Sequence, residues 1–262
     1  MKDKKVAIVI CNYNMFEWAD ELVEHIYKTV KVPYEIIFVD NGSDIVPPSK
    51  YTNYWIPENV QMIRGFMQGV RYADSLGEDF FAYWLVTTSC KFYKEYDGVD
   101  YMKVDPLELL LKVLIDDPKA YAVQSALTFN KGRGSAWRQH HEPRPARKLR
   151  RLWALENVAV LFNAEYFNKL GGWNEELTMG WGISAENFWL ARKEGLHIYN
   201  HDGYVMHKET DVGYEMGRMG MTAKERRRVS SEEVKAYFTP IYGEDYYEVL
   251  NWTHRETGRG EY

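Results

Sequence analysis

Two short β-branched runs near the start of the chain, separated by a segment long enough for one helix, constrain the fold more than any other feature. The runs are VAIVICNYN at residues 6–14 and EIIFVDNGSD at residues 35–44. Short apolar runs that close on turn-forming residues are typical of parallel strands buried on both faces. Ligands of open α/β sheets bind at the carboxyl ends of such strands. We therefore expect one sheet edge to carry the polar residues Asn12, Tyr13, Asn14, Asp40, Asn41 and Ser43.

The polar loop at residues 40–44 has two interpretations. The Asp40 carboxylate can accept hydrogen bonds from N–H or O–H groups of a ligand, and Gly42 lets the backbone approach that ligand closely. The same residue types also bond their own backbone and form turns without any ligand. The loop by itself leaves ligand binding and turn formation equally open.

The rest of the chain continues the alternation of helices and strands. Helices are predicted at residues 19–30, 107–115 and 165–170, and a short strand followed by a helix within residues 59–73. Strands are predicted at residues 80–86, 121–129 and 157–162. Residues 132–151 carry Arg and Pro without periodicity and predict a long mobile loop. This order predicts an α/β domain with a mostly parallel central sheet flanked by helices.

The composition favours one globular domain with a C-terminal extension. The chain has 262 residues, 45% of them hydrophobic, which is ample for a core. Its net charge of −5 offers no general attraction for nucleic acid or anionic membranes.

Cys11 and Cys90 fall in or beside predicted buried strands, which fits a reducing compartment. No signal segment and no apolar run near the roughly 20 residues that span a bilayer are found, so we expect a soluble cytoplasmic protein.

Several short motifs follow the opening runs in a fixed order. They are RGF with Gly69 at residues 64–69, VAVLFNAEYFNKLGGWNE at residues 158–175, a stretch from GWG to EN at residues 180–187, and YVMH at residues 204–207. Together with the opening runs they resemble the family 2 glycosyltransferases of the GT-A fold. The similarity covers roughly residues 6–207, and several weak motifs in one order are more specific than any of them alone.

The resemblance implies a single GT-A, Rossmann-like domain over residues 1–207. Within it, residues 1–100 would bind a nucleotide sugar. Residues 101–207, with a mobile loop at 131–152, would form the acceptor half. Residues 208–262 would form a lid and a helical C-terminal extension.

The resemblance also implies inverting transfer of a sugar from a nucleotide diphosphate donor to the hydroxyl of a carbohydrate or other acceptor. A UDP-sugar is the favoured donor, and Asp40 would hold its nucleoside. The expected nucleotide-binding residues are Asn12, Tyr13, Asn14, Asp40, Asn41, Ser43, Arg64 and Gly65. The expected acceptor-binding residues are Trp181, Gly182 and Asn187.

The chain departs from the family where a divalent cation usually binds. In place of an acidic pair after the strand at 80–86, residues 86–91 read VTTSCK. Hydroxyls are poor ligands for Mg²⁺ or Mn²⁺, whereas an ammonium can stabilise a departing phosphate. We therefore expect Ser89, Lys91 and Arg138 at the diphosphate. A solvated lysine after a strand is the competing interpretation of Lys91.

His207 is the metal-ligand candidate that the family pattern leaves in place. It predicts at most a weak Mn²⁺ or Mg²⁺ site, with Asp97, Asp100 and His201 as less convincing helpers. A histidine at the end of a strand is as typical of a hydrogen-bonded structural residue as of a ligand.

The acidic pair that usually supplies the catalytic base is represented by Glu186 and Asn187. Because an amide cannot take a proton at neutral pH, the resemblance assigns the base to Glu186, whose charge a helix N-terminus would favour. A carboxylate in the first turn of a helix is also common without catalysis. An alternative alignment register places Ser184 at this position and argues for a crippled enzyme.

Two basic clusters leave other functions open. Arginines and lysines within residues 133–151 either clamp the diphosphate, grip an anionic acceptor or form a solvated face. A second cluster at residues 224–228 precedes a helical tail, and residues 210–221 are a candidate lid. The competing functions are a catalytically inactive nucleotide- or glycan-binding relative and, less favoured, a sugar transferase acting on modified nucleic acid bases.

Overall fold

The protein is built around one twisted, mostly parallel sheet. The computed structural model describes residues 3–130, 141–144 and 149–250. The strands run in the spatial order β3 (Tyr54–Ile56), β2 (Tyr34–Asn41), β1 (Lys5–Asn12), β4 (Phe80–Thr87), β10 (Ala159–Asn163), β8 (Ala120–Phe129), β11 (His197–Lys208) and β5 (Cys90–Phe92), and β9 (Leu149–Arg151) also pairs with β11. β1, β2, β3 and β4 are parallel, whereas β10 lies antiparallel between β4 and β8.

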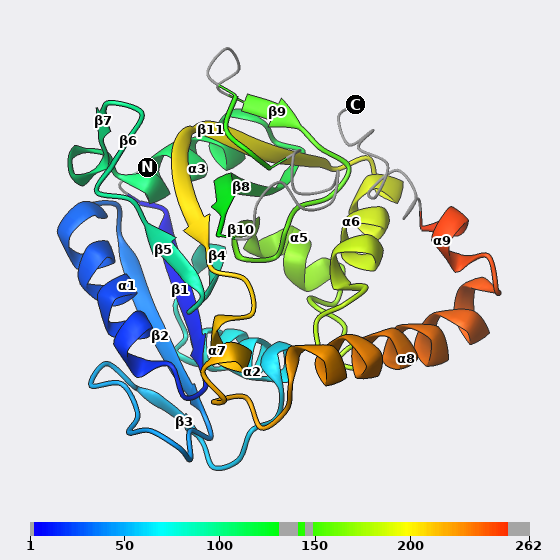
Figure 1. Ribbon diagram of the computed structural model, residues 1–262. Helices are drawn as coiled ribbons and strands as arrows, with labels where there is room; N and C mark the ends of the chain where they lie inside the picture. Colours follow the sequence, from blue (N-terminus) through cyan, green and yellow to red (C-terminus); the bar gives the residue numbers. More distant parts are fainter. Residues whose placement is uncertain (1–2, 131–140, 145–148, 251–262) are drawn as a thin grey trace.

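Helices cover both faces of the sheet (Figure 1). Alternate residues of β1 separate two apolar clusters, since Ile8 packs in one cluster and Val9 in the other. One face carries α1 (Phe16–Thr29) and α3 (Pro106–Asp116), and the other carries α2 (Met62–Ser75), α5 (Ala164–Lys169), α6 (Ile183–Lys193) and α8 (Ala223–Tyr242). The remaining short elements are β6 (Glu95–Tyr96), β7 (Val99–Asp100), a 3₁₀ turn at Tyr101–Lys103, α7 (Val212–Glu215) and α9 (Tyr246–Val249).

The predicted fold class is confirmed, and the element boundaries differ at identifiable places. The short strand expected within residues 59–73 lies earlier, at β3. The Val60 N–H is bonded to the Asn41 side chain and not to the backbone of a neighbouring strand. The strand recognised only at residues 204–207 is the end of the much longer β11. The helix expected at residues 19–30 begins at Phe16.

Part of the predicted mobile loop is a strand. Within the stretch 132–151, β9 pairs antiparallel with β11, and the Arg150 side chain is buried against Asp202. A sequence does not distinguish an arginine that is buried with a carboxylate partner from one that faces solvent. Hydrophobic periodicity therefore did not predict this strand. Arg138 lies outside the described residues, as do the other members of this loop at 131–140 and 145–148.

The C-terminal extension is helical, as predicted, and it is packed into the core. The side chains of Val234 and Phe238 on α8 belong to the same apolar cluster as those of α2 and α6. α8 lies beside the edge toward which β11 points (Figure 1). Within residues 3–130, 141–144 and 149–250, every helix is too short or too polar to cross a bilayer.

Candidate functional site

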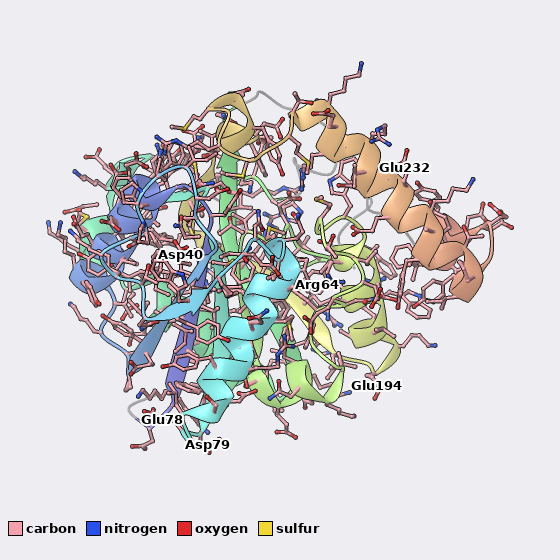
Figure 2. The ribbon with its side chains drawn as sticks, turned by 90° about the horizontal axis from the view of Figure 1, so that it is seen from below. Asp40, Arg64, Glu78, Asp79, Glu194 and Glu232 are labelled. Carbon is pink, nitrogen blue, oxygen red and sulfur yellow. The ribbon has the colours of Figure 1, made fainter. Side chains whose placement is uncertain are left out.

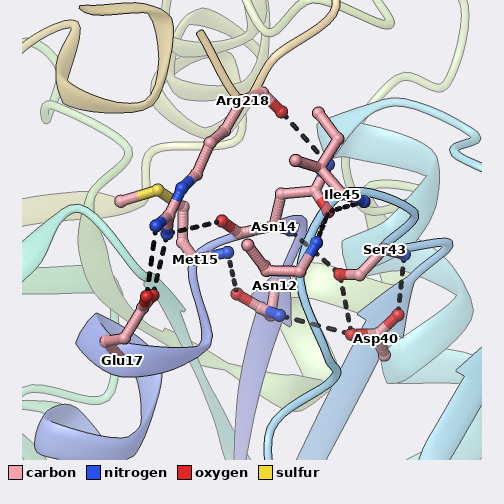
Figure 3. A network of polar contacts seen from close by, with 9 residues as sticks. Asn12, Asn14, Met15, Glu17, Asp40, Ser43, Ile45 and Arg218 are labelled. Carbon is pink, nitrogen blue, oxygen red and sulfur yellow. Dashed lines mark hydrogen bonds and ion pairs between the residues drawn. The ribbon is translucent and has the colours of Figure 1, made fainter. Parts of the chain in front are cut away.

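The carboxyl ends of β1 and β2 carry a buried network of polar side chains (Figure 3). Asp40 is fully buried, and its carboxylate accepts hydrogen bonds from the Ser43 N–H and the Ser43 hydroxyl, both at 2.9 Å. The Asn12 amide donates to the same carboxylate at 3.3 Å. Asp40, which was expected to contact the nucleoside, therefore joins the loop after β1 to the loop after β2.

Asn14 joins three segments of the chain. Its backbone has a φ of 55°, a left-handed conformation that asparagine tolerates better than most side chains. Its Oδ1 accepts hydrogen bonds from the N–H groups of Asp44 and Ile45 at 3.0 Å, and its Nδ2 donates to the Arg218 carbonyl oxygen at 3.1 Å. The Arg218 guanidinium in turn donates to the Asn14 carbonyl oxygen and forms an ion pair with Glu17 at 2.8 Å. The segment after β11 is thus fastened to the first strand-end loop (Figure 3).

Tyr13 and Asp44 are the outward-facing members of these loops. The half-buried Tyr13 donates its hydroxyl to the exposed Asp44 carboxylate at 3.2 Å. Hydrogen bonds from Asn14 and then Tyr13 lower the pKa of Asp44. Asp44 was not among the expected site residues, although its place in the turn-forming run would have justified including it.

Three residues that were expected to bind the nucleotide make contacts within the protein: Asn41, Arg64 and Gly65. The buried Asn41 binds the backbone of Val60 and Gln61. A Cβ atom at Gly65 would lie 2.6 Å from the Cys11 Sγ, so this glycine lets α2 lie close to β1. Arg64 donates to the Glu175 carbonyl oxygen at 3.2 Å. The view from below places Arg64 on α2, between Asp40 on one side and Glu232 of α8 on the other (Figure 2).

Lys91 and Lys208 lie near the region where β4 and β11 end and β5 begins. Lys91 and His207 face each other in register on β5 and β11. The Lys91 Nζ lies 3.7 Å from the Glu209 Oε1 and 3.7 Å from the centre of the Trp18 ring. Lys208, which the sequence reasoning missed, donates to the Ser89 hydroxyl at 2.7 Å. Its place in the sequence next to His207 could have marked it as a candidate site residue.

The two ring nitrogens of His207 lie close to other side chains of the protein. Its Nδ1 lies 2.8 Å from the Thr128 Oγ1, and its Nε2 lies 3.7 Å from the Glu209 Oε1. Burial lowers the pKa of His207, an effect that Glu209 opposes and Lys91 reinforces. In the part of the chain that the structure describes, no group of three or more His, Cys, Asp or Glu side chains could hold a metal ion.

The proposed helpers of His207 lie in other places. Asp97 and Asp100 belong to the hairpin of β6 and β7, where Asp100 pairs with Lys103. His201 precedes the irregularity between His201 and Val205 on β11 and accepts a hydrogen bond from the Gly203 N–H. The structure does not bring them together with His207 as a ligand set.

Glu186 lies in the first turn of α6, and each oxygen of its buried carboxylate accepts a hydrogen bond. The side chain is 6% exposed; the Asn174 Nδ2 donates to Oε2 at 2.8 Å, and the Tyr242 hydroxyl donates to Oε1 at 2.9 Å. Gly182 precedes the helix at a φ of 80°, and a Cβ atom there would lie 2.9 Å from the Phe238 ring. The start of α6 is therefore packed tightly beneath α8.

A pocket of about 360 Å³ opens beside Glu186. Its lining residues are Leu170, Gly171, Gly172, Trp173, Asn174, Glu175, Ile183, Glu186, Asn187, Leu190 and Tyr237. Asn187 is held by the Tyr121 hydroxyl and donates to the Gly172 carbonyl oxygen. Trp181 packs against the apolar cluster, and the buried Ser184 does not line the pocket. Sequence reasoning did not name Asn174, Tyr237 or Tyr242 as site residues, although Asn174 lies within the motif at residues 158–175 and both tyrosines lie in the aromatic helical tail.

The fold is similar to that of known glycosyltransferase structures, whereas the sequence identity to them is low. No protein-family model and no curated protein sequence matches the chain. The crystal structure of GalNAc-T7 with UDP, GalNAc and Mn²⁺ superposes with a TM-score of 0.60 at 13% identity, covering 98% of this chain and 57% of that one. S. aureus TarS 1–349 superposes with a TM-score of 0.54 at 12% identity, covering 96% and 71%. The chain thus spans a little over half of the first neighbour and has a GT-A glycosyltransferase-like fold.

Proposed function

We propose that the protein is an inverting glycosyltransferase that moves a sugar from a nucleotide diphosphate donor, with UDP as the favoured nucleotide, to an acceptor hydroxyl. The observation that carries the proposal is the buried Glu186 carboxylate, held by two donors beside a pocket in a GT-A-like fold. The neighbour crystallised with UDP and GalNAc supports this choice of donor class.

Glu186 acts as the general base in this proposal. The acceptor hydroxyl enters the pocket and gives its proton to the carboxylate while its oxygen attacks the anomeric carbon of the donor. The attack comes from the face opposite the diphosphate, so the configuration inverts. The bond from the anomeric carbon to the diphosphate oxygen breaks, and the diphosphate leaves with the electron pair. The helix N-terminus of α6 favours the negative charge on which the base depends.

The departing diphosphate meets the cationic residues at the ends of β5 and β11. Lys91 and Lys208 supply positive charge, and the Ser89 hydroxyl supplies a hydrogen bond. Mn²⁺ or Mg²⁺ prefers several oxygen ligands, and the pair of His207 and Glu209 does not make a complete set. No step of the proposed reaction therefore passes through a metal ion.

The nucleoside lies against the strand-end loops. Asp40, Asn12 and Asn14 keep these loops in shape, and the outward groups of Tyr13 and Asp44 make the contacts. Asp40 thus contributes to nucleotide binding through the loop conformation, which is a different role from the direct contact implied by the family resemblance.

The test combines binding and turnover. Calorimetric titration with UDP and UDP-sugars, with Mn²⁺ and with chelator, should show binding, and wild type should hydrolyse or transfer the sugar. Glu186→Gln should keep UDP affinity and lose turnover by about 10²- to 10⁴-fold. Glu176→Gln, an exposed neighbour, is the control and should be unaffected. Absence of binding under every condition would reject the proposal, and binding without turnover would favour an inactive nucleotide-binding protein.

A further inference from the structure

The C-terminal helix α8 contributes two tyrosines to the surroundings of Glu186. Tyr237 forms part of the pocket wall, and Tyr242 donates its hydroxyl to the Glu186 Oε1 at 2.9 Å. Both residues lie after the GT-A-like motifs, which end at residue 207. They belong to the segment that the sequence predicts as a lid and a helical extension.

Several contacts fix α8 over the start of α6. The Glu233 carboxylate accepts hydrogen bonds from the Thr178 N–H at 2.9 Å, the Thr178 hydroxyl at 2.6 Å and the Met179 N–H at 3.1 Å. One turn further along α8, Phe238 lies against Gly182. α8 is therefore attached to the loop from which α6 begins, and its tyrosines have little freedom to move away.

The ring of Tyr242 is held in place from two sides. It makes edge contacts with Trp189 on α6 and with Phe238 on its own helix, each with ring centres 5.6 Å apart. Burial, and next the Glu186 carboxylate, raise the pKa of Tyr242. The hydroxyl therefore keeps its proton and remains a hydrogen-bond donor at neutral pH.

We propose that Tyr242 is a positioning residue for Glu186, which makes the C-terminal helix an integral part of the site and not a separate appendage. The Tyr242 hydroxyl and the Asn174 amide each bind one carboxylate oxygen, so together they fix the carboxylate plane. Each oxygen keeps a second lone pair for an acceptor proton. Hydrogen bonds to a charged group are shorter and stronger than those between neutral groups, so these two hold the carboxylate in one orientation. The inference rests on the proposed role of Glu186 as the base.

The primary experiment follows the Glu186 carboxylate directly. Carbon-13 NMR of protein labelled at the glutamate side-chain carboxyl carbons gives its signal at one neutral pH, which the loss of one signal in Glu186→Gln assigns. In Tyr242→Phe the chemical shift of the Glu186 signal should change, because the carboxylate loses one of its two hydrogen bonds. The control Tyr27→Phe changes an exposed tyrosine on α1 and should leave the signal in place. An unchanged Glu186 signal in Tyr242→Phe would overturn the inference.

Turnover separates this inference from the proposed function. If wild type is active, the pH profile of its turnover should shift in Tyr242→Phe, and turnover should fall about tenfold because the base is less well positioned. UDP affinity and the unfolding midpoint should stay close to wild type. Wild type without turnover would reject the proposed function, whereas an active Tyr242→Phe with an unshifted pH profile would reject only the positioning role.

Discussion

Asn14 combines a backbone conformation and a set of hydrogen bonds that few other residues could supply. In Asn14→Ala the N–H groups of Asp44 and Ile45 lose their acceptor, and a Cβ-bearing residue without a local polar group is left at a φ of 55°. We expect the free energy of unfolding to fall by about 2 to 4 kcal/mol, measured by urea denaturation.

Asn14→Gly separates the two causes. Glycine loses the same hydrogen bonds but adopts a positive φ without strain, so its loss of stability should be smaller than that of alanine by about 1 kcal/mol. Equal losses in the two variants would show that the backbone conformation contributes nothing.

His25 is expected to make the stability of the protein depend on pH below neutrality. It is 9% exposed, stacks on Phe92 and hydrogen-bonds to the Tyr204 hydroxyl at 3.2 Å. Burial lowers the pKa of His25 from 6.5 to about 4, with smaller effects of Lys28 and Lys94. Because the unfolded state binds the proton first, the stability associated with neutral His25 is complete above pH 6.5 and is lost as the pH falls toward about 4.

This loss is expected to be about 2 kcal/mol across that window, from unfolding curves measured at successive pH values. His25→Phe keeps an aromatic ring beside Phe92 and removes the titration, so its stability should depend less steeply on pH between these limits. Identical slopes for wild type and variant would assign the acid sensitivity to other groups.

At the scale of elements, β9 depends on a buried ion pair. The Arg150 Nε and one of its terminal nitrogens lie 2.8 and 2.7 Å from the two oxygens of Asp202, and both side chains are almost fully buried. Arg150→Met would leave a buried carboxylate without its cation and should cost about 3 to 5 kcal/mol. The double variant Arg150→Met, Asp202→Leu removes both charges and should recover much of the loss in chemical denaturation. A double variant no more stable than the single one would contradict this account.

The segment after β11 is tied to the first strand-end loop mainly through Arg218. In Arg218→Ala the amides of residues 211–221 should exchange with solvent several-fold faster, because the ion pair with Glu17 and the bond to the Asn14 carbonyl oxygen are lost. The global stability should change by less than about 1 kcal/mol, as for other partly exposed ion pairs. Arg228→Ala, which breaks an exposed pair with Glu232 on α8, is the matched control and should not change exchange in this segment. Unchanged exchange in Arg218→Ala would show that other contacts hold the segment.

At the scale of the whole molecule, the C-terminal helices complete one of the two apolar clusters. A chain that ends at Lys208 loses the buried side chains of Val234, Phe238, Tyr246 and Leu250. We expect this truncation to lower the unfolding free energy by more than about 4 kcal/mol, from the apolar surface it exposes, and to bind apolar dyes. A chain that ends at Leu250 keeps all of the described contacts and is the control. A stable, cooperatively unfolding chain 1–208 would show that the extension is independent of the core.

The sequence by itself determined the α/β class, most of the helices and strands and the polar ends of β1 and β2. These features depend on neighbouring residues, because hydrophobic periodicity and turn chemistry act over a few positions. Glu186 was proposed as the base from the family resemblance and not from these local signals, and the structure has it in the first turn of α6. The local signals failed for β9, where the burial of Arg150 depends on Asp202, 52 residues away.

Only the tertiary structure decided which of the polar side chains meet. Tyr242 contacts Glu186 across 56 residues, and Arg218 contacts Asn14 across 204. It also showed that Asp40 is enclosed by its own loop and that Lys208 stands beside Ser89. Contacts at such separations follow from how helices and strands pack on the sheet. The sequence alone therefore does not distinguish a side chain that points into a site from one that faces solvent.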